Sequence, residues 1–263
     1  MSEHQERSIS AIVTFHKESL LAHKTLLGLE RVRAYAEQRG LDVEYVLVLD
    51  RADAETSRVV ASCPVVRASD RLLHVENGDP GVSRNDGVTA ASGAYVGIFD
   101  GDDLYSENWL YNAWAAVQGK VAKVVVHPDY VVSYGAVHSV GRMLDMERTP
   151  DYSLSSCFSV HPWVCSSFVS RALYLQHPYV RADSARDGFG FEDWHWNLEM
   201  LAAGVRHVAA PQTALFYRRK SSSVLSNHLA NGVLVRPSKF FERPGSWGTP
   251  QSANDVLHEE GAA

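Results

Sequence analysis

The sequence contains little cysteine and no long apolar run. Its three cysteines (Cys63, Cys157 and Cys165) are odd in number, and none of them forms a Cys-x-x-Cys pair. Such a scattered set excludes a disulfide framework or a cysteine-based zinc site, and it favours small buried thiols in a reducing compartment. No apolar stretch approaches the roughly 20 residues that a membrane-spanning helix needs. We therefore expect a chain without a transmembrane segment.

An excess of positive charge is also missing. The formal net charge is -6, which argues against a protein that binds nucleic acid by neutralising phosphates. The first residues, Met1 to Ser8, are polar and carry no apolar core of a secretory signal. We expect a cytoplasmic location. The 263 residues, 45% of them hydrophobic, suffice for one sizeable α/β domain or two small ones.

The first third of the chain has the pattern of a strand, a helix and a second strand. Ile9 to Phe15 and Val43 to Leu49 are short apolar runs, and a helical pattern between them extends to about Arg39. This spacing predicts a βαβ unit with parallel strands and a right-handed crossover. Asp50, which ends the second strand, should therefore lie at the same sheet edge as His16.

The stretch Tyr95 to Leu104 predicts a strand buried on both faces that runs directly into three carboxylates. Asp100, Asp102 and Asp103 offer hard oxygen ligands of the kind that suit Mg²⁺ or Mn²⁺, which often share their remaining positions with substrate phosphates. Ligands of open α/β sheets bind at the carboxyl ends of strands. The alternative is an acidic turn that only caps a helix starting near Ser106.

Two predicted helices bring further polar groups to this edge. One follows the turn at 78–81, is capped by Ser83 and extends to Ala91, so that Arg84 lies in its first turn. The other starts with Glu192 and Asp193. The alternative for this pair is a favourable contact with the helix dipole alone.

The remaining chain predicts a helix at Trp109 to Val117 and strands at 121–126, 130–137, 205–209 and 214–217. We expect the strands at 121–137 to leave the parallel sheet as a β-ribbon. The predicted division is one domain over residues 9–225, with halves at 9–104 and 105–225, and a C-terminal tail at 226–263. The tail is rich in proline, glycine and charge, and it could pack on the surface, contact a partner subunit in a homodimer or stay mobile.

Together these stretches resemble the inverting family 2 glycosyltransferases of the GT-A fold. The stretches that carry the resemblance are Ser10 to His16, Val46 to Asp50, Ser83 to Gly87, Gly93 to Asp103 and Phe191 to Trp194. Their order and spacing cover about residues 9 to 225. The resemblance implies an α/β fold with a mostly parallel, Rossmann-like central sheet, helices on both faces and a smaller β-ribbon and helix region on the acceptor side.

The resemblance also implies roles for individual residues. In this family an Asp-x-Asp motif holds a divalent metal, Mn²⁺ or Mg²⁺, against the diphosphate of a nucleotide sugar. Here the motif matches Asp100 and Asp102, with Asp102 the expected direct ligand. The catalytic base of the family matches Asp193. The positions expected to bind the donor are Thr14, His16, Asp50, Arg84 and Asp100.

The sequence departs from the family pattern at two places. The loop after the second strand has only one of its usual acids, Asp50. The run after the last strand has Lys220 where many members have a histidine, and we expect this lysine or Arg219 to offset diphosphate charge. Its alternative is a solvated surface position. His228 is a reserve candidate for the metal, and Glu192, Trp163 and Trp196 are candidates for acceptor binding.

The expected function is a metal-dependent inverting glycosyltransferase of the hexosyltransferase type. It would move a sugar from a nucleoside-diphosphate sugar, with UDP favoured, to a hydroxyl of a carbohydrate or other acceptor. One alternative is a nucleotidyltransferase, although the glycine-rich phosphate loop of that class is missing after the first strand. The other is a non-catalytic nucleotide-sugar-binding protein on the same fold.

Overall fold

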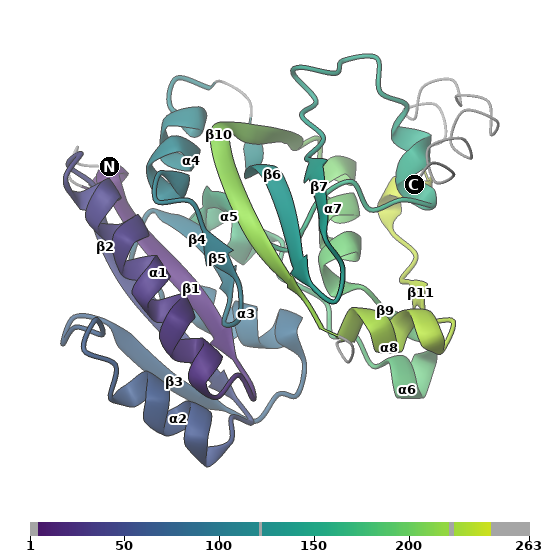
Figure 1. Cartoon of the computed structure of the whole chain (residues 1–263). Helices are drawn as coiled ribbons and strands as arrows, with labels where there is room; N and C mark the ends of the chain where they lie inside the picture. The colour runs from purple at the N-terminus through teal and green to yellow at the C-terminus, as the bar shows by residue number, and fades with distance from the viewer. Residues whose placement is uncertain (1–4, 121–122, 221–223, 243–263) are drawn as a thin grey trace.

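The computed structural model describes residues 5–120, 123–220 and 224–242 (Figure 1). It is a mixed α/β fold around one curled sheet, which confirms the expected fold class. Helices cover both faces of the sheet. On one face lie α1 (Leu20–Glu37), α2 (Ala54–Ala61) and α4 (Trp109–Val117); on the other lie α3 (Pro80–Ala90), α5 (Arg171–Gln176) and α7 (Glu192–Ala202).

Within these ranges the sheet has nine strands in the order β3-β2-β1-β4-β8-β6-β10-β5, with β7 beside β6. The strands are β1 (Ser8–Phe15), β2 (Asp42–Asp50), β3 (Arg71–Val75), β4 (Tyr95–Asp100), β5 (Leu104–Tyr105), β6 (Val124–Gly135), β7 (Ser139–Arg142), β8 (Phe168–Ser170) and β10 (Arg206–Arg219). The long ladders β1–β2, β1–β4, β2–β3 and β6–β10 are parallel, whereas the short strands β5, β7 and β8 pair antiparallel.

The strand β1 is buried on both faces because its side chains alternate between two cores. Ala11 and Val13 face the core under α1 and α4, whereas Ile12 faces the core under α3, α5 and α7. Continuous apolar strands of this kind are typical of parallel sheets that helices cover on both faces. The predicted βαβ unit is confirmed by the parallel pairing of β1 with β2.

Helix α3 begins earlier than its sequence pattern predicted. The expected cap was Ser83, but the helix begins at Pro80, and the side chain of Asp79 accepts a hydrogen bond from the Val82 amide at 2.8 Å. Proline suits the first position of a helix because the backbone N–H of that position makes no hydrogen bond within the helix. Ser83 is therefore inside the helix, and its hydroxyl is free to donate to the end of β2.

Two pairs of predicted strands are each a single strand. The predicted strands at 121–126 and 130–137 form β6, which stays in the main sheet beside β10 while β7 folds back on it (Figure 1). Residues 121 and 122 lie outside the described residues. The strands predicted at 205–209 and 214–217 form β10, which is interrupted only by an irregularity between Ala210 and Ala214. The predictions of separate strands are wrong, because residues 211–213 form an irregularity within β10 rather than a turn, and β6 continues opposite it.

The described part of the predicted tail packs against α7. It contains α8 (Val224–Ala230), β11 (Leu234–Val235) and the 3₁₀ turn Lys239–Glu242. β11 pairs with β9 (Phe189–Gly190), and Phe240 is buried in a small core with Trp163 and Leu198. Ser221 to Ser223 and residues 243–263 lie outside the described residues. Among the described helices, none combines the length and the apolar character needed to cross a bilayer.

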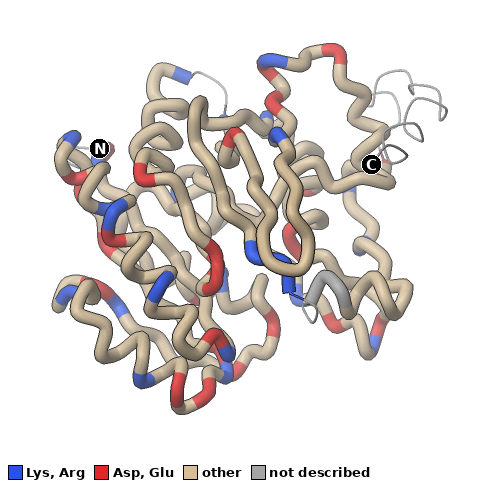
Figure 2. The backbone as a smooth tube through the Cα atoms, in the orientation of Figure 1, with Lys and Arg blue, Asp and Glu red and all other residues tan. Residues whose placement is uncertain are grey.

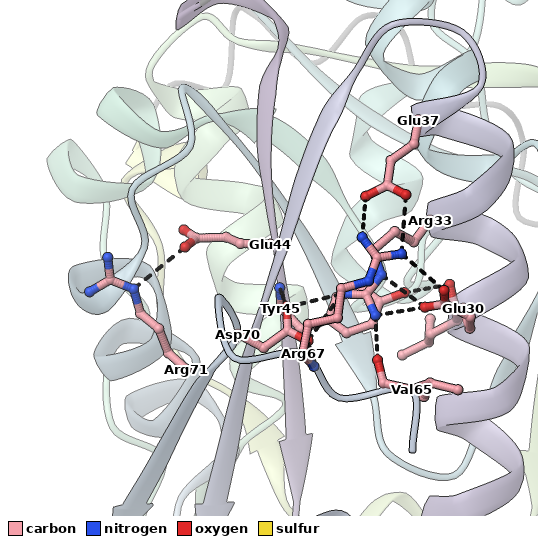
Figure 3. A network of polar contacts seen from close by, with 10 residues as sticks. Glu30, Arg33, Glu37, Glu44, Tyr45, Val65, Arg67, Asp70 and Arg71 are labelled. Carbon is pink, nitrogen blue, oxygen red and sulfur yellow. Dashed lines mark hydrogen bonds and ion pairs between the residues drawn. The ribbon is translucent and has the colours of Figure 1, made fainter. Parts of the chain in front are cut away.

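A buried ion network ties α1 to the edge of the sheet (Figure 3). The guanidinium of Arg33 is fully buried and bonds Asp70 at 2.9 Å and Glu30 at 2.6 Å. It also lies 4.0 Å from the ring centroid of Tyr45. Asp70 accepts from the Tyr45 amide at 2.8 Å, so the network joins α1 and β2. Removing one partner of such a buried set typically costs about 3–5 kcal/mol, because the other charge stays buried without compensation.

Candidate functional site

The carboxyl ends of β1 and β4 lie in register at one edge of the sheet. Thr14 pairs with Asp100, and the Gly101 amide donates to the Thr14 carbonyl at 3.0 Å. A Cβ on Gly101 would lie 2.3 Å from Cδ1 of Phe15 and 2.7 Å from the Thr14 carbonyl oxygen. Only glycine fits this close approach of two backbones. The middle residue of the Asp-Gly-Asp motif therefore allows the chain to leave β4 with its acids at the edge.

Asp100 is held by protein groups on both carboxylate oxygens. Nη2 of Arg84 donates to Oδ1 at 3.1 Å, and the Cys165 thiol donates to Oδ2 at 2.8 Å. The Thr14 hydroxyl lies 3.5 Å from Oδ1. Burial alone raises the pKa of Asp100, but the Arg84 charge and these hydrogen bonds outweigh it and lower the pKa below its ordinary value.

Arg84 joins Asp100 to the start of α7. Its Nη1 donates to Oε1 of Glu192 at 2.7 Å, so one buried guanidinium binds a strand end and a helix N-terminus. Burial raises the pKa of Glu192, and the Arg84 charge opposes this effect. The predicted placement of Arg84 at the sheet edge is borne out. The geometry assigns Glu192 as its partner.

Asp102 faces two basic side chains at the end of β10. Nζ of Lys220 lies 2.5 Å from Oδ2 of Asp102, and Nη1 of Arg218 lies 3.9 Å from the same oxygen. Figure 2 shows basic positions gathered at this end of β10. Positions two apart along a strand face the same side, and the intervening Arg219 instead lies over the ring of Tyr217.

Asp103 is turned into the protein. Its Oδ1 accepts from the Arg218 amide at 2.8 Å, and its buried Oδ2 has no hydrogen-bond partner among the described residues. Burial raises the pKa of Asp103 well above the ordinary value, and the charges of Asp100 and Asp102 act in the same direction. Asp103 therefore connects the acidic turn to β10.

The donor set at this edge is compatible with a hard divalent cation bound together with phosphates. In the described parts of the chain, no three His, Cys, Asp or Glu side chains converge into a complete metal cage. Mg²⁺ typically needs only one or two carboxylates when substrate phosphates and water supply the other ligands. Asp102 meets this condition because its carboxylate is 14% exposed and already attracts cationic groups. Asp100 fits less well because both of its oxygens accept hydrogen bonds from the protein.

Asp193 lies in the first turn of α7. Its Oδ1 accepts from the Trp194 amide at 2.9 Å, and its Oδ2 lies 3.9 Å from Nδ1 of His161. Burial raises the pKa of Asp193, the Arg84 charge lowers it, and the Asp100 charge raises it further. A carboxylate with a raised pKa at the edge of a site is suited to accept a proton near neutral pH.

Asp50 and His16 form the opposite side of the edge. The carboxylate of Asp50 accepts from the Gly78 amide at 2.9 Å, the Asp79 amide at 3.2 Å and the Ser83 hydroxyl at 2.9 Å. These bonds hold the loop before α3 against the end of β2. The ring of His16 is exposed, and its Nδ1 lies 2.7 Å from the Asp50 carbonyl oxygen. His16 is therefore an exposed residue tied to the end of β2.

The structure does not bring Trp163 and Trp196 to the site. Trp196 is 1% exposed, stacks on Tyr174 and donates from its indole to the His177 carbonyl at 2.7 Å. Trp163 is 3% exposed and stacks on His207. Neither ring has a face open to an acceptor sugar. Trp196 lies on the face of α7 that packs into the core with Tyr174 and Met200, and Trp163 lies in a segment without a regular period.

His228 lies on the α7 side of the site. Its ring packs edge-on against Phe191 at a centroid distance of 5.0 Å, and its side chain and Glu192 line one cavity of about 240 Å³. The other lining residues are Gly78, Asp79, Pro80, Ala182, Ser184 and Asn227. The described contacts of His228 do not include the Asp100–Asp103 turn.

Four further residues lie at the site although the sequence pattern did not predict them as site residues. Cys165 and His161 lie in a segment without a readable pattern, and no local signal marks them. Glu18 is a half-buried carboxylate that accepts from the His16 amide at 2.5 Å, and desolvation raises its pKa. Arg218 could have been found, because it shares a strand face with Lys220.

The curled α/β sheet, with acids and basic side chains at the ends of its strands, matches the fold of GT-A glycosyltransferase structures. The model of the family described as "Glycosyl transferase family 2" matches residues 10–155, more than half of the chain. The chain therefore belongs to glycosyl transferase family 2, and the resemblance inferred from the sequence is confirmed.

Curated relatives agree with this family. The succinoglycan biosynthesis protein ExoO of Rhizobium meliloti (strain 1021) is 27% identical over 197 residues, which cover 71% of this chain and 55% of the relative. The glycosyltransferase GlyG of Streptococcus pneumoniae serotype 4 is 30% identical over 102 residues, covering 38% of this chain and 34% of the relative. The chain thus spans about half or less of the length of these relatives.

Solved structures share the fold. TarS of S. aureus (residues 1–349) in complex with UDP-GlcNAc aligns with a TM-score of 0.63 and 15% identity, covering 96% of this chain and 77% of TarS. The mannosyltransferase PcManGT of Pyrobaculum calidifontis, in complex with GDP-Man and Mn²⁺, aligns with a TM-score of 0.60 and 17% identity, covering 92% of this chain and 65% of PcManGT. At this identity the likeness shows the fold.

Proposed function

We propose that this protein transfers a sugar from a nucleoside-diphosphate sugar to an acceptor hydroxyl with inversion at the anomeric carbon. The observation that carries the proposal is the double contact of Arg84. By binding Asp100 at 3.1 Å and Glu192 at 2.7 Å, it holds the acidic turn after β4 and the first turn of α7 around one point. These two contacts support the proposal that the donor-binding turn and the proton-accepting helix act together.

The donor diphosphate is proposed to bind at the Asp102 side of this arrangement. Lys220 and Arg218 supply positive charge there, and Arg84 adds a third cation behind Asp100. Mg²⁺ or Mn²⁺, when bound, would stabilise the charge that develops on the departing nucleoside diphosphate. Asp102 is the residue proposed to hold the ion. UDP is the favoured nucleotide.

Asp193 is proposed to act as the general base. As the acceptor oxygen bonds to the anomeric carbon, its proton passes to the carboxylate of Asp193. The bond from that carbon to the phosphate oxygen breaks, and the nucleoside diphosphate leaves with the electron pair. A single displacement of this kind inverts the anomeric centre, and a positioned base contributes roughly 10²–10⁴-fold to the rate.

Two fold neighbours support the choice of ligands to be tested. TarS was solved with UDP-GlcNAc, and PcManGT with GDP-Man and Mn²⁺. The first experiment is a thermal-shift panel of UDP-GlcNAc, UDP-glucose, GDP-mannose and dTDP-glucose, each with and without MnCl₂ or MgCl₂. A ligand at 100 times its Kd adds about 2.7 kcal/mol to the stability of the folded state. We expect stabilisation by a nucleotide sugar that increases when the metal is present.

The control is the Asp102→Asn variant. Without ligand it should melt at the temperature of the wild type, and with a nucleotide sugar it should lose the part of the shift that depends on the metal. Nucleotide release is then measured with the donor that stabilises most. If none of the four donors shifts the melting temperature with either metal, the proposed function is wrong. Binding without nucleotide release across a panel of sugar acceptors would instead favour a non-catalytic nucleotide-sugar-binding protein.

A further inference from the structure

His161 lies against the face of α7 that carries the proposed base. Its ring stacks on that of Trp194, with 5.5 Å between centroids and an interplanar angle of 4°. The indole of Trp194 is in turn fixed by donating to the Cys157 carbonyl at 2.9 Å. His161 comes from the segment between β7 and β8, so a distant part of the chain places an imidazole beside the first turn of α7.

The two ring nitrogens of His161 face two residues that are one helical turn apart. Nδ1 lies 3.9 Å from Oδ2 of Asp193, and Nε2 lies 2.9 Å from Nδ2 of Asn197. Positions i and i+4 of a helix lie above one another on the same face. The imidazole therefore spans Asp193 and Asn197 along α7.

These contacts select one tautomer of the neutral ring. The Asn197 amide nitrogen is only a donor, so Nε2 of His161 must accept, and the ring proton is then on Nδ1. An ionised carboxylate is only an acceptor, so Asp193 also favours Nδ1–H. Both neighbours thus favour the same proton position. Asn197 is 1% exposed, so its side chain is buried beside the imidazole.

We propose that His161 is a positioning residue for Asp193: its Nδ1–H group, held in that tautomer by Asn197, restrains the carboxylate in the orientation that receives the acceptor proton. The inference rests on the proposed function, because it assumes that Asp193 is the base. His161 contacts Asp193 and takes no part in the proton transfer. At 3.9 Å the pair is longer than a hydrogen bond, so the proposal is that Nδ1–H and Oδ2 of Asp193 come within bonding distance when substrate is bound.

The surroundings keep His161 neutral. Burial lowers its pKa to about 3, so the ring is uncharged at neutral pH and retains one proton. His127 and His207 belong to the same buried group, and burial lowers their pKa values as well. The other charges that act on Asp193 are Arg84, which lowers its pKa, and Asp100 and Glu192, whose negative charges oppose its ionisation.

Two substitutions separate the two contacts of the ring. The side-chain amide of asparagine can occupy the place of Nδ1, so His161→Asn keeps a donor toward Asp193 and loses the Asn197 contact. The longer side chain of glutamine reaches the place of Nε2, so His161→Gln keeps an acceptor for Asn197 and loses the donor toward Asp193. The matched control is His138→Gln, because His138 is exposed on the turn between β6 and β7.

The kinetic arm measures nucleotide release from the donor identified by thermal shift. We expect His161→Gln to lower kcat at least tenfold with little change in KM for the donor, and His161→Asn to stay within about threefold of the wild type. Loss of the donor hydrogen bond also destabilises the ionised form of Asp193. The acid limb of the kcat/KM profile of His161→Gln should therefore move to higher pH, and that of His138→Gln should not move.

A spectroscopic arm needs no turnover. In protein labelled with ¹⁵N-histidine, long-range ¹H–¹⁵N correlation spectra distinguish a ring protonated at Nδ1 from one protonated at Nε2. We expect His161 to carry its proton on Nδ1 at pH 7, with a changed Nδ1 resonance in Asp193→Asn. A proton on Nε2, or equal kcat and pH profiles for His161→Asn and His161→Gln, would overturn the proposal. If the wild type releases no nucleotide while the Nδ1 proton is found, the proposed function fails and the contact with Asp193 stands.

Discussion

Arg84 and Glu192 form a buried ion pair of 2.7 Å that joins two helices 108 residues apart in the chain. The guanidinium is 4% exposed and the carboxylate 8%. The same guanidinium binds Asp100, so the pair connects the strand that ends in the acidic motif with the helix that carries Asp193. The alignment of the proposed donor and acceptor sides therefore depends on one side chain.

Replacing Arg84 by methionine should destabilise the protein strongly. The change leaves Asp100 and Glu192 buried beside an apolar side chain, and loss of one partner from a buried pair costs about 3–5 kcal/mol. Urea unfolding followed by circular dichroism measures this cost. The control is Arg71→Met, which breaks an exposed pair with Glu44 at 3.5 Å and should cost at most about 1 kcal/mol. Equal costs for the two variants would contradict the role of Arg84.

Asp193→Asn should separate binding from turnover. The amide has the size of the carboxylate but cannot accept the acceptor proton, so kcat should fall roughly 10²–10⁴-fold while the thermal shift with donor is kept. Asp151→Asn, at an exposed position, serves as the control and should behave like the wild type. Turnover that survives unchanged in Asp193→Asn would show that another group accepts the proton.

Asp102 and Lys220 should affect the metal-dependent and the metal-independent parts of nucleotide binding separately. Asp102→Asn removes the negative charge proposed to hold the metal, so the increase in UDP affinity on adding Mn²⁺ should fall at least tenfold. Lys220→Met removes a cation 2.5 Å from Asp102, so binding of UDP without metal should weaken. Titration calorimetry with UDP, with and without MnCl₂, measures both effects. Lys24→Met, at an exposed position of α1, is the control for the loss of a lysine. Metal-enhanced binding that persists in Asp102→Asn contradicts the assignment of the metal to Asp102.

The buried histidines should make the fold sensitive to acid. Burial lowers the pKa of both His127 and His161 to about 3, whereas an unfolded histidine titrates near 6.5. Between these values the unfolded chain binds more protons than the folded one, so stability is complete above about pH 6.5 and falls as the pH is lowered toward 3. The loss is at most about 1.4 kcal/mol per pH unit for each histidine.

Urea unfolding at pH 7.5, 6.5, 5.5 and 4.5 tests this dependence. His127→Gln should reduce the slope of the unfolding free energy against pH by at most the contribution of one histidine, about 1.4 kcal/mol per pH unit. This expectation holds whatever the substitution does to stability at pH 7.5. His138→Gln should leave the slope unchanged because His138 is exposed. An unchanged slope in His127→Gln would mean that His127 is protonated equally in both states.

Local patterns sufficed to predict several elements in the first half of the chain. The apolar runs of β1 and β2 and the intervening helix were predicted within one or two residues, and α4 has the predicted bounds Trp109–Val117. Strand and helix periodicities and glycine turns act over a few residues, so they can be read directly. The position of Asp100 and Asp102 at the edge follows from the same signals, because parallel strands end on one side.

The segment between β7 and β8 could not be read in this way. Its residues follow no regular period, and their conformation is determined by packing against α7 and β10. Trp163 is fixed by its stacking on His207, and His161 by its stacking on Trp194. Aromatic residues in such a segment carry no local sign of whether they face a core or a ligand.

What the sequence determined by itself is the order of strands and helices, the acidic motif after β4 and the family. Only the tertiary structure decided which partner each charge has: Arg84 for Asp100 and Glu192, Lys220 for Asp102, and the amides of Gly78 and Asp79 for Asp50. Periodicity is a property of residues that are close in the sequence, whereas these pairs join helices and strands that come into contact only in the folded sheet. Burial and charge pairing depend on that contact.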